Sequence, residues 1–100
     1  MSVIRTFTVT VGNPGSGNRY YIDGVLQETV NLAEGYTYKF DVSDSSVSGH
    51  PFKFSTTSNG THSGGSEYTT GVTTSGNAGD NGAYVQIVVA ASAPQLYYYC

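Results

Sequence analysis

The sequence predicts an all-β domain, an antiparallel Greek-key β-sandwich of about seven strands. Short stretches in which apolar and polar residues alternate recur along the chain, and clusters of Gly, Ser, Asn and Asp separate them. Thr and Ser supply 24 of the 100 residues, Gly 13 and Tyr 9, a composition that favours strands and turns. The length predicts a single domain spanning residues 1–100.

The N-terminal quarter predicts a strand and a hairpin. Residues 3–11, "VIRTFTVTV", alternate apolar side chains with threonines, and only Arg5 interrupts the apolar face. In residues 19–27, "RYYIDGVLQ", the pair Asp23-Gly24 stands between apolar residues. Asp-Gly is typical of a tight type I′ turn, so we expect a β-hairpin here.

The middle of the chain predicts three further strands. Residues 29–32, "TVNL", restart a strand pattern, and residues 50–55, "HPFKFS", alternate again. Residues 36–42, "YTYKFDV", have the clearest alternation in the chain. There we expect Tyr36, Tyr38, Phe40 and Val42 to point inward and Thr37, Lys39 and Asp41 to point outward.

The C-terminal half contains a long polar stretch and two strands. Residues 56–82 are rich in Thr, Ser, Gly and Asn. Because long structureless loops are uncommon, we expect either one short edge strand near 67–73 or a functional excursion. Residues 83–91 and 96–100 complete the strands. The inward-facing set is expected to include Phe7, Val9, Tyr38, Phe40, Phe52, Phe54, Val85, Ile87, Val89 and Leu96.

Charge and hydropathy exclude several function classes. Charged residues make up 11% of the chain, the formal net charge is −3, and its four basic residues are scattered. A phosphate-binding surface needs clustered cations, so we expect no nucleic-acid binding. No apolar run approaches the roughly 18–20 residues that a membrane helix requires, so no membrane span is expected.

The sequence offers little for catalysis. No Ser stands in a G-x-S-x-G elbow, and the seven carboxylates fall mostly in turns or on polar strand faces. Residues 41–46, "DVSDSS", bring two aspartates close together but lack the Gly and distal Glu of a calcium loop, and we favour a capped polar turn. His62 lies in a polar loop and is expected to be solvated. We therefore expect no enzymatic activity.

His50 and Cys100 carry a resemblance to a known family. "YTYKFDVSDSSVSGHPFKF" resembles the cupredoxin pattern of an aromatic strand, a turn and a His that opens the next strand, and "APQLYYYC" resembles the strand that leads to the copper-binding Cys. The resemblance implies that His50 and Cys100 lie close together as metal ligands. A type 1 copper site also needs a second His and usually a Met after the Cys. Since nothing follows Cys100, we expect no cofactor unless the natural chain continues past it.

The sequence is also similar to cupredoxin-like modules in large surface and virion proteins of aquatic bacteria and their phages. The similarity lies in "YYIDGV", "GHPFKFSTTSNGTH", "EYTTGVTTSG" and "LYYYC". It implies a non-enzymatic structural or interaction module on a virion or an extracellular cell surface. Its tyrosines and hydroxyls would contact capsid or tail proteins, or copies of itself. The alternatives are a type 1 copper electron-transfer domain truncated at its cysteine ligand and a carbohydrate-binding sandwich.

Overall fold

The computed structural model describes residues 3–15, 17–28, 30–56, 67–91 and 93–99, and their fold is all-β. They form two sheets, mostly antiparallel, in an arrangement consistent with a β-sandwich. The only helix in these residues is a short 3₁₀ turn, η1 (Ser45–Val47). The strands are β1 (Val3–Gly12), β2 (Arg19–Ile22), β3 (Val25–Leu26), β4 (Thr37–Asp41), β5 (Lys53–Ser55), β6 (Glu67–Tyr68), β7 (Val72–Ser75), β8 (Tyr84–Val88) and β9 (Tyr97–Tyr99).

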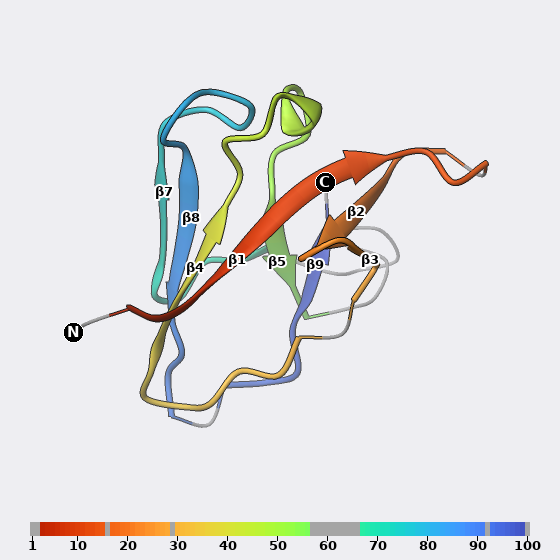
Figure 1. The fold of residues 1–100 in the computed structure, drawn as a ribbon. Coiled ribbons are helices and arrows are strands. Elements are labelled where there is room, and N and C mark those ends of the chain that lie inside the picture. Colours follow the sequence, from red (N-terminus) through yellow and green to blue (C-terminus); the bar gives the residue numbers. More distant parts are fainter. Residues whose placement is uncertain (1–2, 16, 29, 57–66, 92, 100) are drawn as a thin grey trace.

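The larger sheet has six strands in the order β3-β2-β1-β4-β8-β7. Strand β1 pairs in parallel with β4 over Val3–Thr8, then antiparallel with β2 over Val9–Gly12. Figure 1 shows β1 crossing the molecule diagonally, with β4, β8 and β7 on one side and β2 and β3 on the other. The prediction of a purely antiparallel fold was wrong at the β1–β4 pair. The β2–β3 hairpin occupies one edge of β1, so β4 takes the opposite edge, and the connection after β3 brings it there parallel to β1.

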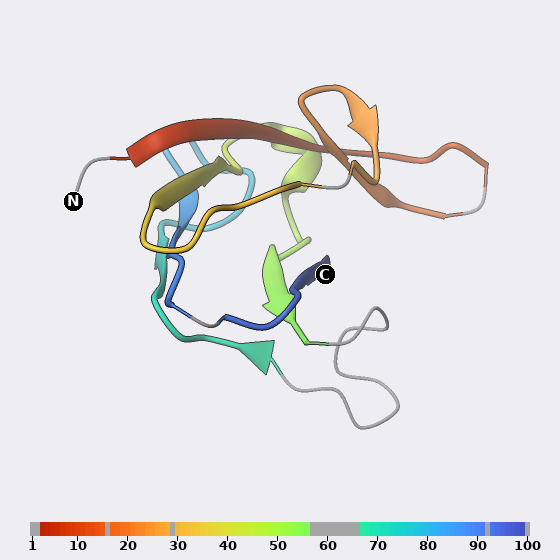
Figure 2. The ribbon, with the colours of Figure 1, turned by 90° about the horizontal axis from the view of Figure 1, so that it is seen from below.

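The smaller sheet has three antiparallel strands in the order β6-β5-β9. Figure 2 shows it as a second layer below β1. The single edge strand expected near 67–73 is instead two strands in different sheets, since β6 pairs with β5 and β7 pairs with β8. The chain passes from one sheet to the other at Gly71, whose φ is 72°. A Cβ at this position would clash with the carbonyl oxygen of Val88, so the turn requires glycine. This division raises the count of strands in the described residues from the expected seven to nine.

The core matches the expected inward set with one exception. Leu96 is only half-buried, whereas the other nine expected residues are buried. Phe40 is 1% exposed and joins the layers, because its ring centroid lies 4.9 Å from that of Phe7 on β1 and 5.0 Å from that of Phe52, just before β5. Aromatic pairs at such distances add to the free energy of burial.

At the start of β4 the expected orientation was wrong. Tyr36 is 49% exposed and Thr37 is 1% exposed, the reverse of the prediction. Thr37 lies between Val3 and Val88 on its two neighbouring strands, at the point where the β1–β4 register shifts between Val3 and Arg5. Tyr36 precedes the paired part of the strand.

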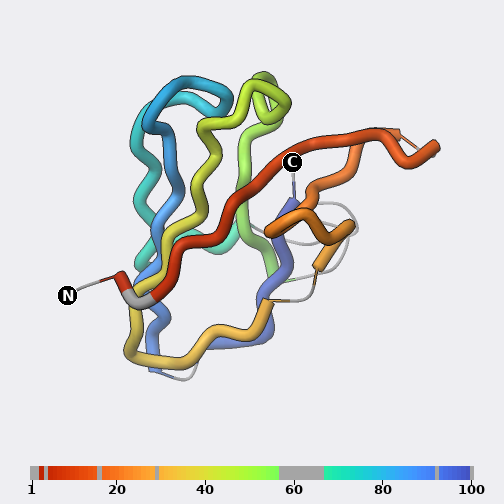
Figure 3. Tube along the Cα trace, in the orientation of Figure 1, coloured from red at the N-terminus to blue at the C-terminus, as the bar shows by residue number. Residues whose placement is uncertain are grey.

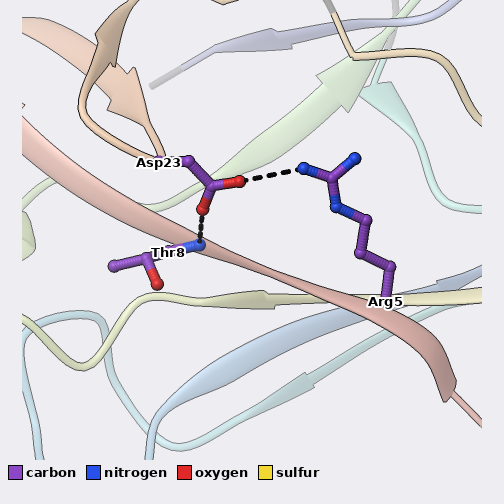
Figure 4. A network of polar contacts seen from close by, with 3 residues as sticks. All are labelled: Arg5, Thr8 and Asp23. Carbon is purple, nitrogen blue, oxygen red and sulfur yellow. Dashed lines mark hydrogen bonds and ion pairs between the residues drawn. The ribbon is translucent and has the colours of Figure 1, made fainter.

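The Asp-Gly hairpin turn is confirmed. Asp23 and Gly24 have φ values of 52° and 83°, both positive as a type I′ turn requires. Asp23 also holds β1 where that strand changes partner, since its backbone N–H donates to the carbonyl of Thr8 and its carboxylate accepts from the N–H of Thr8, each at 2.8 Å. The other carboxylate oxygen accepts from Arg5 at 3.1 Å (Figure 4). Arg5 interrupts the apolar pattern because its guanidinium covers the Phe7 ring, 4.3 Å from the centroid.

Replacing the central ring should destabilise the fold strongly. We expect Phe40→Ala to lower the free energy of unfolding by about 3–5 kcal/mol, the usual cost of removing a buried Phe. Val25→Ala is the control, because Val25 is 47% exposed and its loss should change stability by no more than about 0.5 kcal/mol. Chemical denaturation measures both. An unchanged midpoint for Phe40→Ala would contradict the proposed role of this ring.

Two substitutions at the hairpin separate hydrogen bonding from charge. Asp23→Asn keeps an oxygen acceptor for the N–H of Thr8 and tolerates positive φ, so we expect a cost of about 0.5 kcal/mol or less from the lost exposed ion pair. Asp23→Ala removes the acceptor. It also places at positive φ a residue whose side chain cannot form a local hydrogen bond, so stability should fall by about 1–2 kcal/mol. Equal losses in thermal or urea denaturation would show that the charge, and not the hydrogen bond to Thr8, holds the turn.

Candidate functional site

A groove of about 490 Å³ lies between two connecting segments, one within the larger sheet and one that crosses from β8 to the smaller sheet. One segment follows β3 and the other leads into β9. Figure 3 shows them running in opposite directions along the lower end of the molecule. The groove is lined by Gln27, Glu28, Val30, Asn31, Leu32, Glu34, Phe40, Phe54, Val89, Ala93, Pro94, Gln95, Leu96, Tyr97 and Tyr98.

One wall of the groove is a segment that was predicted to be a strand. Of residues 29–32, Thr29 lies outside the described part, and 30–32 form no strand, so the prediction was wrong for these three. The side chains still alternate as expected, because Val30 and Leu32 pack against the core and Asn31 is exposed. Alternation specifies which side chains are buried, whereas a strand also needs a partner backbone, and none of the described strands pairs with 30–32.

The floor and the second wall are apolar. Phe40, Phe54 and Val89 form the floor, and each is at least nine-tenths buried. Leu96 and Tyr98 belong to the second wall, which explains why Leu96 is half-buried. Strand β9 pairs with β5 along one edge, and no strand in the described residues occupies its other edge. The groove therefore places core side chains beside an open strand edge.

Tyr98 connects the two walls. Its hydroxyl donates to the carbonyl oxygen of Glu28 at 2.6 Å, and its ring stacks on Phe52 with centroids 5.3 Å apart. Burial, assisted by the nearby carboxylate of Glu28, raises the pKa of Tyr98 to about 12. Tyr98 therefore stays protonated and keeps donating its hydrogen bond at any physiological pH.

The charge in the groove is negative. Glu28 and Glu34 are exposed at the rim, and the lining residues named above include no Lys, Arg or His. They also include no Ser, Cys or Thr that could act as a nucleophile. Within the described residues, the groove therefore combines an apolar floor with a negatively charged rim.

The predicted metal ligands are only partly placed. His50 is half-buried just before β5, and its carbonyl oxygen accepts from the hydroxyl of Tyr20 at 2.9 Å. Cys100 and His62 lie outside the described residues, so the proximity of His50 and Cys100 stays a prediction. Tyr99, the last residue of β9, pairs with Lys53, the first residue of β5. In the residues that the structure describes, no three His, Cys, Asp or Glu side chains come together as a metal site would need.

The two aspartates of "DVSDSS" are engaged by neighbouring serines. Asp41 accepts from the backbone N–H of Ser43 at 2.9 Å, and Asp44 caps η1 by accepting from the N–H of Ser46 at 3.0 Å. The hydroxyl of Ser46 also donates to Asp44, and these bonds from Ser46 hold the pKa of that carboxyl below its usual value. The same hydroxyl accepts from the N–H of Val11 at 2.9 Å, which ties η1 to β1. The interpretation as a capped turn is confirmed.

A second candidate surface is the outer face of the six-stranded sheet. The pairing registers align its polar side chains in two rows that cross β1, β4, β8 and β7. We call these two rows the hydroxyl face, and all eight of their residues are exposed or half-exposed. The first row is Thr6, Lys39, Gln86 and Thr73, and the second is Thr8, Asp41, Tyr84 and Ser75.

Comparison with known proteins gives no further guide to these surfaces. No family model, curated protein or solved structure matches the chain. Among the described residues, no helix has the length and apolar character needed to cross a membrane.

The raised pKa of Tyr98 predicts a pH dependence of stability. An unfolded tyrosine ionises near pH 10, whereas folded Tyr98 ionises at about 12. Between these values the unfolded chain releases this proton and the folded chain retains it, so stability falls as pH rises from about 10 to 12. Tyr98→Phe should be less stable at pH 7 by about 1 kcal/mol for the lost hydrogen bond. Its melting temperature should then decline less steeply above pH 10 than that of the original protein. If the melting temperatures of the two proteins fell equally steeply above pH 10, the raised pKa of Tyr98 would be contradicted.

Proposed function

We propose that this chain is a non-enzymatic interaction module of a virion or an extracellular cell surface. In this proposal the two sheets form a cupredoxin-like Greek-key sandwich, and the hydroxyl face contacts capsid or tail proteins or copies of the chain itself. The main support is the geometry of that face, on which eight polar side chains stand in two rows across four paired strands. A regular polar surface of this kind offers many hydrogen-bonding groups to a second protein surface.

The hydroxyl face favours a protein over a carbohydrate as its partner. Sugars are usually held by stacking on an open aromatic ring, and Tyr84 is the one aromatic residue in the two rows. The ammonium of Lys39 lies over the Tyr84 ring, 4.3 Å from the centroid, so that ring face is already occupied. Short hydroxyl side chains such as Thr6 and Thr73 lose little conformational entropy when they are fixed in a protein contact.

Site-specific photo-crosslinking on intact cells or particles of the source organism tests this proposal. A photoreactive residue at Thr73, on the hydroxyl face, should give a discrete crosslinked protein. The same residue at Val25, which is exposed on β3 away from this face, is the matched control and should give less.

Two further results define the outcome. Thr6→Arg combined with Ser75→Arg should abolish the crosslink from Thr73 while leaving the melting temperature nearly unchanged, because both residues are at least partly exposed. No product from Thr73, or equal products from both positions, would contradict a contact through the hydroxyl face. A product that a glycosidase removes would indicate the carbohydrate alternative.

A further inference from the structure

We propose that the groove beside β9 binds an extended segment of a partner protein, which adds to β9 as a neighbouring strand. The segment would be apolar at alternate positions and would carry a Lys or Arg. This site is separate from the hydroxyl face, so either proposal can fail without the other.

The backbone of the groove fits strand addition. Strand β9 is an edge strand whose hydrogen bonds to β5 use one side of its backbone, so its other side has no strand partner in the described residues, and Tyr97 and Tyr98 of this strand line the groove. In the opposite wall, the backbone of 30–32 forms no hydrogen bond with another backbone group in the part of the chain that the structure describes. A strand between these walls finds peptide donors and acceptors along both edges, which is how edge-strand recognition gains affinity.

The side chains of the groove select for alternation. Phe40, Phe54 and Val89 form an apolar floor below the open edge of β9. Successive side chains of an added strand point to opposite faces, so every second one would enter the groove and contact this floor. The others would point away from the core. An occupant with apolar residues at every second position therefore buries its apolar side chains without burying its polar ones.

The negative charge of the groove favours a partner segment with positive charge. Glu28 and Glu34 are the charged residues among those that line it, and both lie at the rim. A cation of the added strand near Glu28 is complementary to that carboxylate, whereas an acidic segment is repelled. The chain itself has formal net charge −3, which also opposes a second copy as the occupant.

A short synthetic peptide tests this site directly. The probe is an N-acetylated and C-amidated peptide of about seven residues, the usual length of a strand, with Val at alternate positions, Thr between them and Lys at both ends. Titration followed by NMR should show saturable binding of one peptide per chain. Shifts should concentrate at Leu96, Tyr98 and Val30, and the amide protons on the open edge of β9 should exchange at least roughly tenfold more slowly.

Three matched peptides identify the basis of binding. N-methylation of alternate peptide nitrogens on the edge that pairs with β9 should abolish binding, because it removes the strand hydrogen bonds and leaves the side chains. Replacement of the Val residues by Ser should abolish it through loss of apolar burial. Replacement of both Lys by Glu should weaken binding roughly three- to tenfold at low salt and by less at about 1 M salt.

Variants of the protein complete the test. Glu28→Gln should weaken binding of the Lys peptide and leave a Gln-ended peptide unaffected, while Thr73→Ala on the hydroxyl face, outside the groove lining, should change neither. No saturable binding of the probe, or binding that every N-methylated peptide retains, would overturn the proposal. So would concentration-dependent self-association that protects the β9 amides without peptide, because the occupant would then be a second copy.

Discussion

The packing of Phe40 between the two layers is the contact on which the rest of the structure depends. No strand of the described residues pairs across the two sheets, so the three short strands of the smaller sheet are positioned by side-chain packing. Phe40 lies within stacking or edge contact of Phe7 on its own sheet and of Phe52 and Phe54 on the other side. The same ring forms part of the groove floor, so the groove sits on the most constrained part of the molecule.

Much of the fold could be predicted because its signals are local. The alternation in "YTYKFDV" identified β4, and Asp23-Gly24 identified a hairpin turn whose two positive φ values the structure reproduces. Pairing partners could not be predicted, because they depend on residues distant in sequence. The alternation of apolar and polar residues specifies which face of a strand is buried, but not which strand pairs with it. The parallel β1–β4 pair and the division of 67–73 between two sheets could therefore not be predicted.

The candidate site was harder to predict, for a related reason. Val30 and Leu32 had the correct burial pattern, yet the groove exists because the backbone between them lacks a partner, a property that no residue pattern encodes. The groove also draws its floor from β4, β5 and the end of β8, which come together only after the layers pack. The copper ligands suggested by His50 and Cys100 stay a prediction. By contrast, the capped turn at Asp44 was predictable, because a short-range Asp–Ser spacing is sufficient to form it.

The edge strands of the two sheets differ in how they are protected against pairing with other chains. Open strand edges promote unwanted pairing, and proteins limit this risk with very short edge strands or with charge. Strands β3 and β6 have two residues each, and β6 also carries Glu67, which forms an ion pair with Lys53 of β5 at 3.7 Å. Edge strands β7 and β9 carry no charged side chain in their described residues. Strand β7 is mostly polar, with Thr73, Thr74 and Ser75, whereas the three residues of β9 are tyrosines beside a groove with an apolar floor. The Tyr98–Glu28 hydrogen bond ties β9 to the opposite wall. Of these two uncharged edges, the one at β9 adjoins an apolar floor, and for this reason the proposed partner strand is placed at β9 and not at β7.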